Sequence, residues 1–169
     1  MAKALIVIAQ NGYQDVELKG TRDGLIEAGF EVELCSKEAR ECMGKFEGKE
    51  QAVVAMRDAD VSRYDRFAFI GGPGAKELRE DDEALDLARR IAKTGKVFGA
   101  ICIAPTILAA AGVLDGKEAA VWNEDGDQGI YVEQFGVFFT GEHITIDGNI
   151  ITADGPEVAV DFGKKLAAL

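Results

Sequence analysis

An apolar run over residues 97–101 stops at Cys102, and three residues later Pro105 begins a stretch of helix-favouring residues. The run is partly β-branched, as strands buried on both faces of a parallel sheet commonly are. Proline suits the first turn of a helix, because its missing N–H would have no partner there. The pattern therefore predicts that Cys102 lies on a sharp turn from a strand into a helix.

Such a turn brings two backbone segments close together, so only small residues fit two places before and after its central residue. Ala100 and Ala104 hold these two places. The free N–H groups at the start of the helix favour a negative charge, so we expect a lowered pKa and a reactive thiol at Cys102. The alternative is a buried cysteine that packs as a small apolar side chain, which is the commoner fate of a single cysteine.

The rest of the chain alternates between strand and helix patterns. Strands are predicted at residues 4–10, 30–35, 65–70, 97–101 and 119–122, with a closing hairpin over 143–152. Helices are predicted at 15–28, where Asp15 is expected to be the cap, at 82–94, from 105 onward and at 156–169. A hairpin-like segment is expected at 50–56 and an acidic loop at 123–129.

This alternation predicts one α/β domain over residues 1–169. We expect a flavodoxin-like three-layer sandwich, with a mostly parallel sheet, helices on both faces and a cysteine nucleophile elbow. Sites in such folds form at the carboxyl ends of strands. Three segments are predicted to meet there: residues 11–17, the glycine-rich segment 71–74, and Cys102.

Thirty acidic residues against nineteen basic ones give a formal net charge of −11. This charge repels phosphates, so neither nucleic acid nor an anionic membrane surface is an expected partner. The apolar run at 4–9 is too short to be a signal peptide or a membrane span. Three cysteines, an odd number without an export signal, predict reduced thiols and a cytoplasmic location.

Four motifs in order along the chain resemble the ThiJ/PfpI superfamily, which includes PfpI-type proteases and the parkinsonism-associated deglycase. They are the helix opening at 15–18, the strand end at 70–74, the cysteine elbow at 100–105 and the tail at 147–153. The resemblance covers nearly the whole chain. It also implies the fold of class I glutamine amidotransferases and at least a homodimer.

The resemblance implies that Cys102 is the nucleophile and that Glu17 is a protonated acid hydrogen-bonded to it. Glu17 has an alternative role, as a first-turn acid that favours the helix dipole. The backbone N–H groups of Gly72 and Ile103 would form the oxyanion pocket. Asn11 and Trp122 are candidates for lining the pocket, although core packing is the more usual role of a tryptophan.

One departure from the family pattern separates this chain from the PfpI-type proteases, which carry histidine directly after the nucleophile. Ile103 stands there and can neither accept nor deliver a proton. The deglycase branch also lacks this histidine, so the resemblance is closer to that branch. The single histidine, His143, is expected in the final hairpin, away from the elbow.

No metal or cofactor is expected, because a single histidine and two cysteines with six residues between them, Cys35 and Cys42, do not match the usual ligand spacings. Cys35 and Cys42 are interpreted as bystanders, with Cys42 an exposed thiol in a polar stretch.

Two functions remain. The first choice is a thiol sensor in oxidative or carbonyl stress, whose Cys102 oxidises to a sulfinate held by Glu17, with an oxidant as its small-molecule partner. The alternative is a cofactor-independent glyoxalase or deglycase acting on methylglyoxal. A cysteine peptidase is weaker, because Ile103 replaces the elbow histidine, and amidotransfer is weaker still.

Overall fold

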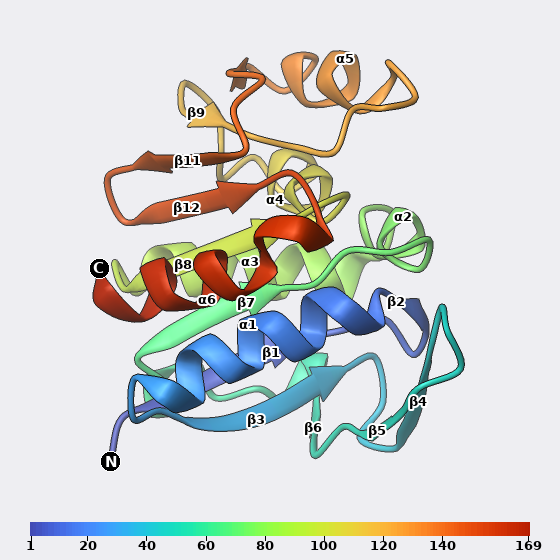
Figure 1. Ribbon diagram of the computed structural model, residues 1–169, viewed down its shortest axis with the longest axis vertical. Helices are drawn as coiled ribbons and strands as arrows, with labels where there is room; N and C mark the ends of the chain where they lie inside the picture. Colours follow the sequence, from blue (N-terminus) through green and yellow to red (C-terminus); the bar gives the residue numbers. More distant parts are fainter.

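A seven-stranded sheet forms the centre of the computed structural model, which describes all residues 1–169 (Figure 1). In spatial order its strands are β11 (Ile144–Asp147), β12 (Ile150–Ala153), β8 (Val97–Ile101), β7 (Arg66–Phe69), β1 (Lys3–Val7), β3 (Glu31–Ser36) and β6 (Val54–Ala55). Every neighbouring pair is parallel except β11 and β12, which form the closing hairpin. The mostly parallel sheet predicted from the sequence is confirmed.

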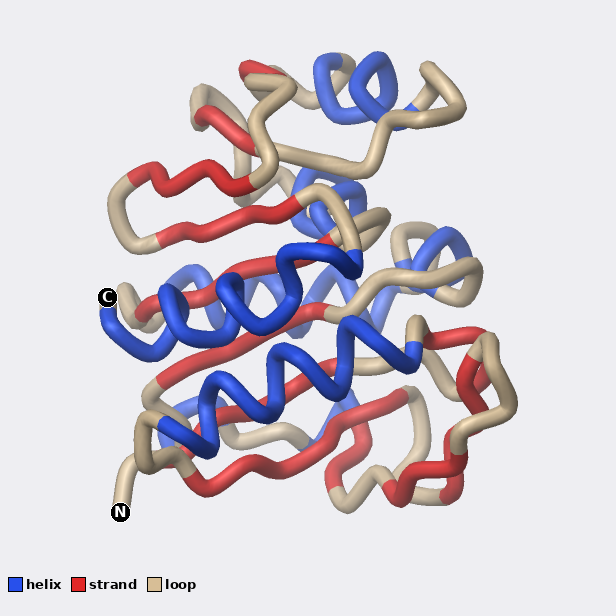
Figure 2. The backbone as a smooth tube through the Cα atoms, in the orientation of Figure 1, coloured by secondary structure: helices blue, strands red, loops and turns tan.

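Helices cover both faces of this sheet, which gives three layers (Figures 1 and 2). On one face lie α1 (Asp15–Glu27) and α6 (Ala159–Ala168), and on the other lie α3 (Asp82–Lys93) and α4 (Pro105–Ala110). Two short helices, α2 (Ala75–Leu78) and α5 (Gln128–Glu133), and three 3-10 turns at 56–58, 61–63 and 156–158 complete the helical structure. None of the helices combines the length and the apolar character that crossing a lipid bilayer requires.

Two small sheets lie beside the main one. The first joins β2 (Asn11–Tyr13), β4 (Glu41–Gly44) and β5 (Lys49–Gln51), and the second pairs β9 (Glu118–Ala119) with β10 (Phe138–Phe139). The hairpin predicted at 50–56 is therefore misplaced, because the turn lies at residues 45–48, where Gly44 N–H bonds to Gly48 O. The predicted acidic loop at 123–129 also ends early, since α5 begins at Gln128.

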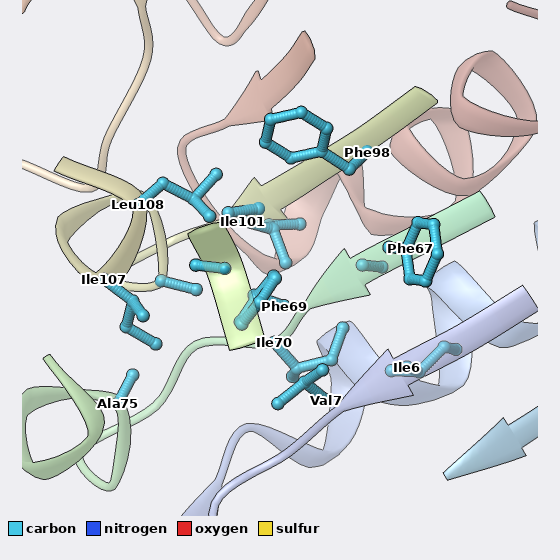
Figure 3. Packing of buried hydrophobic residues seen from close by; sticks show 14 of the residues in the cluster. Ile6, Val7, Phe67, Phe69, Ile70, Ala75, Phe98, Ile101, Ile107 and Leu108 are labelled. Atoms are coloured by element: carbon cyan, nitrogen blue, oxygen red, sulfur yellow. The ribbon is translucent and has the colours of Figure 1, made fainter. Parts of the chain in front are cut away.

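The core lies against both faces of the central sheet. Phe67, Phe69 and Phe98, on β7 and β8, are almost completely buried. Figure 3 shows apolar side chains from β1, β7, β8 and α4 gathered into one cluster. Burial on both faces explains why these strands are nearly all apolar in the sequence.

The start of α1 differs from the prediction that Asp15 caps it. The Gln14 side chain accepts the cap hydrogen bond from the Glu17 N–H, at 2.9 Å. The Asp15 carboxylate accepts instead from the N–H groups of Phe46 and Gly48, each at 2.9 Å. Asp15 therefore fixes the β4–β5 turn against α1, because that turn offers it two unpaired backbone donors.

Candidate active site

Cys102 lies where β8 ends and the turn into α4 begins, and its backbone is in the left-handed region with φ of +64°. This conformation is uncommon for a residue other than glycine. It is held from both sides, because the Cys102 N–H donates to Ala153 O and its carbonyl accepts from Trp122 N–H, each at 2.8 Å. The sharp strand-to-helix turn predicted at Cys102 is therefore present.

Two glycines after β7 allow close packing at the site: Gly71 leaves room for the Glu17 and Cys102 side chains, and Gly72 leaves room for the backbone of residues 12–14. A Cβ atom on Gly71 would lie 2.7 Å from the Cys102 Cβ and 2.8 Å from Glu17 Oε1. Gly72 has φ of +102°, and a Cβ there would lie 2.5 Å from the Gly12 carbonyl oxygen. Both positions exclude larger residues, because the site needs the space and the backbone conformation that glycine alone provides.

The Glu17 carboxyl is fully buried beside the Cys102 thiol. Its Oε1 accepts from the Gly71 N–H at 3.0 Å, whereas Oε2 has no hydrogen-bond partner. Burial raises the pKa of Glu17 to about 7, although the neighbouring Cys102 thiol, the hydrogen bond from Gly71 and the charge of Lys45 lower it. A carboxyl with this pKa is present in both protonation states near neutral pH.

The N–H groups of Gly72 and Ile103 lie next to the sulfur of Cys102 and lower its pKa. Burial and the neighbouring Glu17 carboxylate outweigh them and raise the pKa of Cys102 above that of an ordinary thiol. The lowered pKa that the sequence predicts is therefore wrong. The helix after the elbow has only six residues, and its first N–H groups do not offset the loss of water.

Glu17 and Cys102 act as a coupled pair. Two neighbouring negative charges at a buried site destabilise each other, so the pair carries a single negative charge over a wide pH range. Protonation of Glu17 removes the charge that opposes thiolate formation at Cys102. The thiolate is thus favoured when Glu17 holds the proton.

A cavity of about 320 Å³ opens over this pair. Its lining residues come from six different parts of the chain: Gln14, Glu17, Lys45, Gly72, Pro73, Lys76, Cys102, Ile103, Trp122, Glu124 and Pro156. Four of the residues proposed from the sequence, Glu17, Gly72, Cys102 and Ile103, thus meet at one place. Trp122, proposed as a possible lining residue, is half-buried and also lines this cavity.

Asn11 does not line the cavity, contrary to the sequence-based proposal. Asn11 belongs to the short strand β2, where it pairs with Met43 of β4. Its side chain is exposed.

Sequence reasoning missed three charged lining residues, Lys45, Lys76 and Glu124. Lys76 follows the glycine-rich segment closely, and its position after a strand end was a usable signal. Lys45 and Glu124 reach the cavity from a hairpin turn and a loop, whose placement no local pattern reveals.

His143 is exposed, and its Nδ1 lies 2.8 Å from Asp154 Oδ2, a contact that raises the pKa of the imidazole. It does not line the cavity over Cys102. It lines a neighbouring cavity of about 200 Å³ that shares Trp122, Glu124 and Pro156 with the first.

The other two cysteines lie away from the cavity and are both buried. The prediction of an exposed Cys42 is wrong, because β4 turns its side chain inward, where Gln10 Nε2 donates to the sulfur at 3.3 Å. Burial raises the pKa of Cys35 to about 12 and also raises that of Cys42. Neither thiol is activated. No group of three or more His, Cys, Asp or Glu side chains is arranged to hold a metal ion.

Comparison with known proteins places this geometry in a family. The family model described as the DJ-1/PfpI family matches residues 2–169. An uncharacterised protein of Methanocaldococcus jannaschii is 32% identical over 98% of this chain and 80% of its own length. Deglycase PfpI of Pyrococcus furiosus is 27% identical over 90% of each chain. A glutathione-independent glyoxalase of Caenorhabditis elegans is 24% identical over 96% of this chain and 86% of its own length.

Solved structures agree on the fold. The ThiJ/PfpI domain protein of Brachyspira murdochii superimposes with a TM-score of 0.92, at 23% identity, over 98% of this chain and 94% of that chain. The family match over almost the whole length confirms the resemblance noted in the sequence. The chain belongs to the DJ-1/PfpI family.

Proposed function

We propose that this protein is a cofactor-independent enzyme of carbonyl-stress protection, which converts small 2-oxoaldehydes into hydroxy acids through Cys102 and Glu17. The observation that carries the proposal is the Glu17 carboxyl, which is fully buried beside the sulfur, has no hydrogen-bond partner at Oε2 and has a pKa of about 7. An acid–base group works best when its pKa lies near the operating pH. Relatives named deglycase and glutathione-independent glyoxalase support the same class of chemistry.

The first step is addition of the Cys102 thiolate to the aldehyde carbon. A carbon–sulfur bond forms, the electron pair of the C=O bond moves to oxygen, and the oxygen takes the proton from Glu17 to give a hemithioacetal. The N–H groups of Gly72 and Ile103, which already face the sulfur, stabilise the negative charge on that oxygen before it is protonated.

The second step is an internal transfer of hydrogen. The Glu17 carboxylate removes the hydrogen of the former aldehyde carbon as a proton, and a proton returns to the neighbouring carbonyl carbon through an enediol. The product is a 2-hydroxy thioester of Cys102. Water then cleaves the thioester and releases the hydroxy acid and the thiol. One carbon is oxidised and its neighbour reduced, so water is the only co-reactant.

The test is lactate formation from methylglyoxal by the wild-type protein, Cys102→Ala and Glu17→Gln. The wild-type protein should form lactate, and Cys102→Ala should form none. Glu17→Gln should lower kcat by at least about a hundredfold, which is the lower end of the range for loss of an acid–base group. Absence of lactate with wild type, or turnover that survives in Cys102→Ala, would overturn the proposal.

A second candidate is the thiol sensor, and one observation favours it: no histidine lines the cavity over Cys102. The same amides and a protonated Glu17 would donate to the oxygens of a cysteine sulfinate. In this case peroxide treatment adds two oxygens to Cys102, Glu17→Gln blocks the second addition, and methylglyoxal yields no lactate. Lactate formation that depends on Cys102 would exclude a pure sensor.

A further inference from the structure

Two lysines line the cavity over Cys102 from different elements. Lys45 lies in the β4–β5 turn, and Lys76 lies on α2, directly after the glycine-rich segment. Both are exposed, and neither forms an ion pair. Two elements therefore bring cations without an ion-pair partner to the cavity over Cys102.

The lining of this cavity is less acidic than the molecule as a whole. The chain carries a formal net charge of −11, whereas the two lysines balance Glu124 and the single negative charge of the Glu17–Cys102 pair. Both lysines lack an ion-pair partner, so an anionic ligand can pair with them. The lysine charge also reaches the reaction centre, because Lys45 lowers the pKa of Glu17.

The β4–β5 turn is fixed rather than free. Its backbone N–H groups at Phe46 and Gly48 donate to Asp15, and Lys45 N–H donates to Tyr13 O. The ammonium group of Lys45 lies 5.2 Å from the centre of the Phe46 ring. The turn thus holds the base of the lysine side chain at the cavity, while its flexible end can follow a small ligand.

We propose that Lys45 and Lys76 bind an anionic group of the substrate, such as a carboxylate, so that the cavity selects carbonyl compounds that carry a negative charge close to the reacting carbon. A volume of about 320 Å³ lies at the small end of the range for ligand sites and suits a small organic acid. This inference rests on the proposed function, in which Cys102 adds to a carbonyl. It goes further by naming the charge of the substrate.

The test compares two alkylating reagents of nearly equal size, iodoacetate and iodoacetamide. Both need the thiolate, so the ratio of their rate constants at Cys102 cancels the thiolate fraction and reports the local charge. The rates are measured by peptide mass spectrometry of Cys102 in wild type, Lys45→Gln and Lys76→Gln. Lys93→Gln is the matched control, because Lys93 is exposed on α3 without an ion pair and does not line the cavity.

Each cavity variant should lower the iodoacetate-to-iodoacetamide ratio by about two- to fivefold, the range expected for an exposed charge pair. Lys93→Gln should leave the ratio unchanged, and Glu124→Gln should raise it. High salt should reduce all these differences. A ratio unaffected by both Lys45→Gln and Lys76→Gln, or changed equally by Lys93→Gln, would overturn the inference.

The alkylation test does not depend on turnover. If the protein forms no lactate but the iodoacetate-to-iodoacetamide ratio depends on the lysines, the proposed enzyme activity is refuted and the anion site is supported. If lactate forms but the ratio does not depend on the lysines, the enzyme activity is supported and the anion site is refuted.

Discussion

The most unusual residue in this protein is Glu17, an acid at the first turn of a helix whose carboxyl is completely buried. Burying an ionised carboxyl is costly, and Oε2 lacks the hydrogen bonds that would offset the cost. The neutral form of the carboxyl is therefore favoured. Selection for folding stability alone would not retain an acid at this position. The proposed function at Cys102 would account for its presence.

Glu17 should make the free energy of unfolding depend on pH in a defined way. Its pKa is raised from 4.5 to about 7 in the folded protein, so the folded state binds the proton more tightly than the unfolded state. The stability that this proton contributes is fully present below pH 4.5 and is lost as pH rises through about 7. The loss amounts to about 3 kcal/mol.

Glu17→Gln has no ionisable group at this position and serves as the reference. Denaturant unfolding of both proteins between pH 4.5 and pH 8 should show wild type losing stability relative to Glu17→Gln by that amount. Parallel stability curves for the two proteins would show that the folded state does not raise the pKa of Glu17.

Sequence reasoning could locate Cys102, Glu17, Gly72 and Ile103, because strand ends and the family motifs mark them directly. It could not give the pKa of the thiol, since local helix geometry predicts a lowered value and tertiary burial reverses it. Lys45 was equally hidden, because only the pairing of β4 with β2 brings its turn to the cavity.

At the scale of elements, α1 is tied to two neighbours. Its first residue, Asp15, holds the β4–β5 turn, and its glycines allow close packing on α6. The sequence shows the helix but neither partner, because a cap residue and a helix glycine each have several possible uses. The hairpin that follows β3 was misplaced because short polar segments do not show which strands they pair with.

Asp15→Ala should free the turn that carries Lys45. Loss of two hydrogen bonds to a charged acceptor should cost about 1–3 kcal/mol in the free energy of unfolding. The amides of Phe46 and Gly48 should also exchange with solvent faster, as measured by hydrogen exchange. Asp23→Ala, which removes only an exposed pair with Lys19 on the same helix, should cost at most about 1 kcal/mol. Equal effects of the two variants would contradict this role of Asp15.

Gly24→Ala should destabilise the protein, although alanine is the better helix former. A Cβ at this position would lie 2.7 Å from the Lys164 backbone nitrogen and 2.8 Å from the Gly163 carbonyl carbon. The steric cost of about 1–3 kcal/mol outweighs a gain in helix propensity of about 1 kcal/mol. Denaturant unfolding measures the difference, and a more stable variant would show that α1 and α6 do not pack this closely.

At the scale of the whole molecule, the order of strands and helices was predictable because a two-sided parallel sheet imposes long apolar runs separated by helices. β1, β7 and β8 are such runs, and their carboxyl ends converge where the sequence places the site. The small sheets and α5 were not predictable, because short polar segments acquire their structure from their neighbours.

The oligomeric state remains a prediction from the family resemblance. We expect a homodimer or a larger homo-oligomer, and light scattering coupled to gel filtration measures the mass directly. A mass equal to one chain at micromolar concentration would contradict this expectation.

Cys102 and Glu17 share one negative charge. The most direct test of this sharing is the ultraviolet titration of the Cys102 thiolate in wild type and Glu17→Gln, each measured against the same protein with Cys102→Ala to remove the signal of the other cysteines. Removing the charge at residue 17 should lower the pKa of the Cys102 thiol, because the carboxylate raises it and the amides of Gly72 and Ile103 remain. An unchanged or higher thiol pKa in Glu17→Gln would contradict the account.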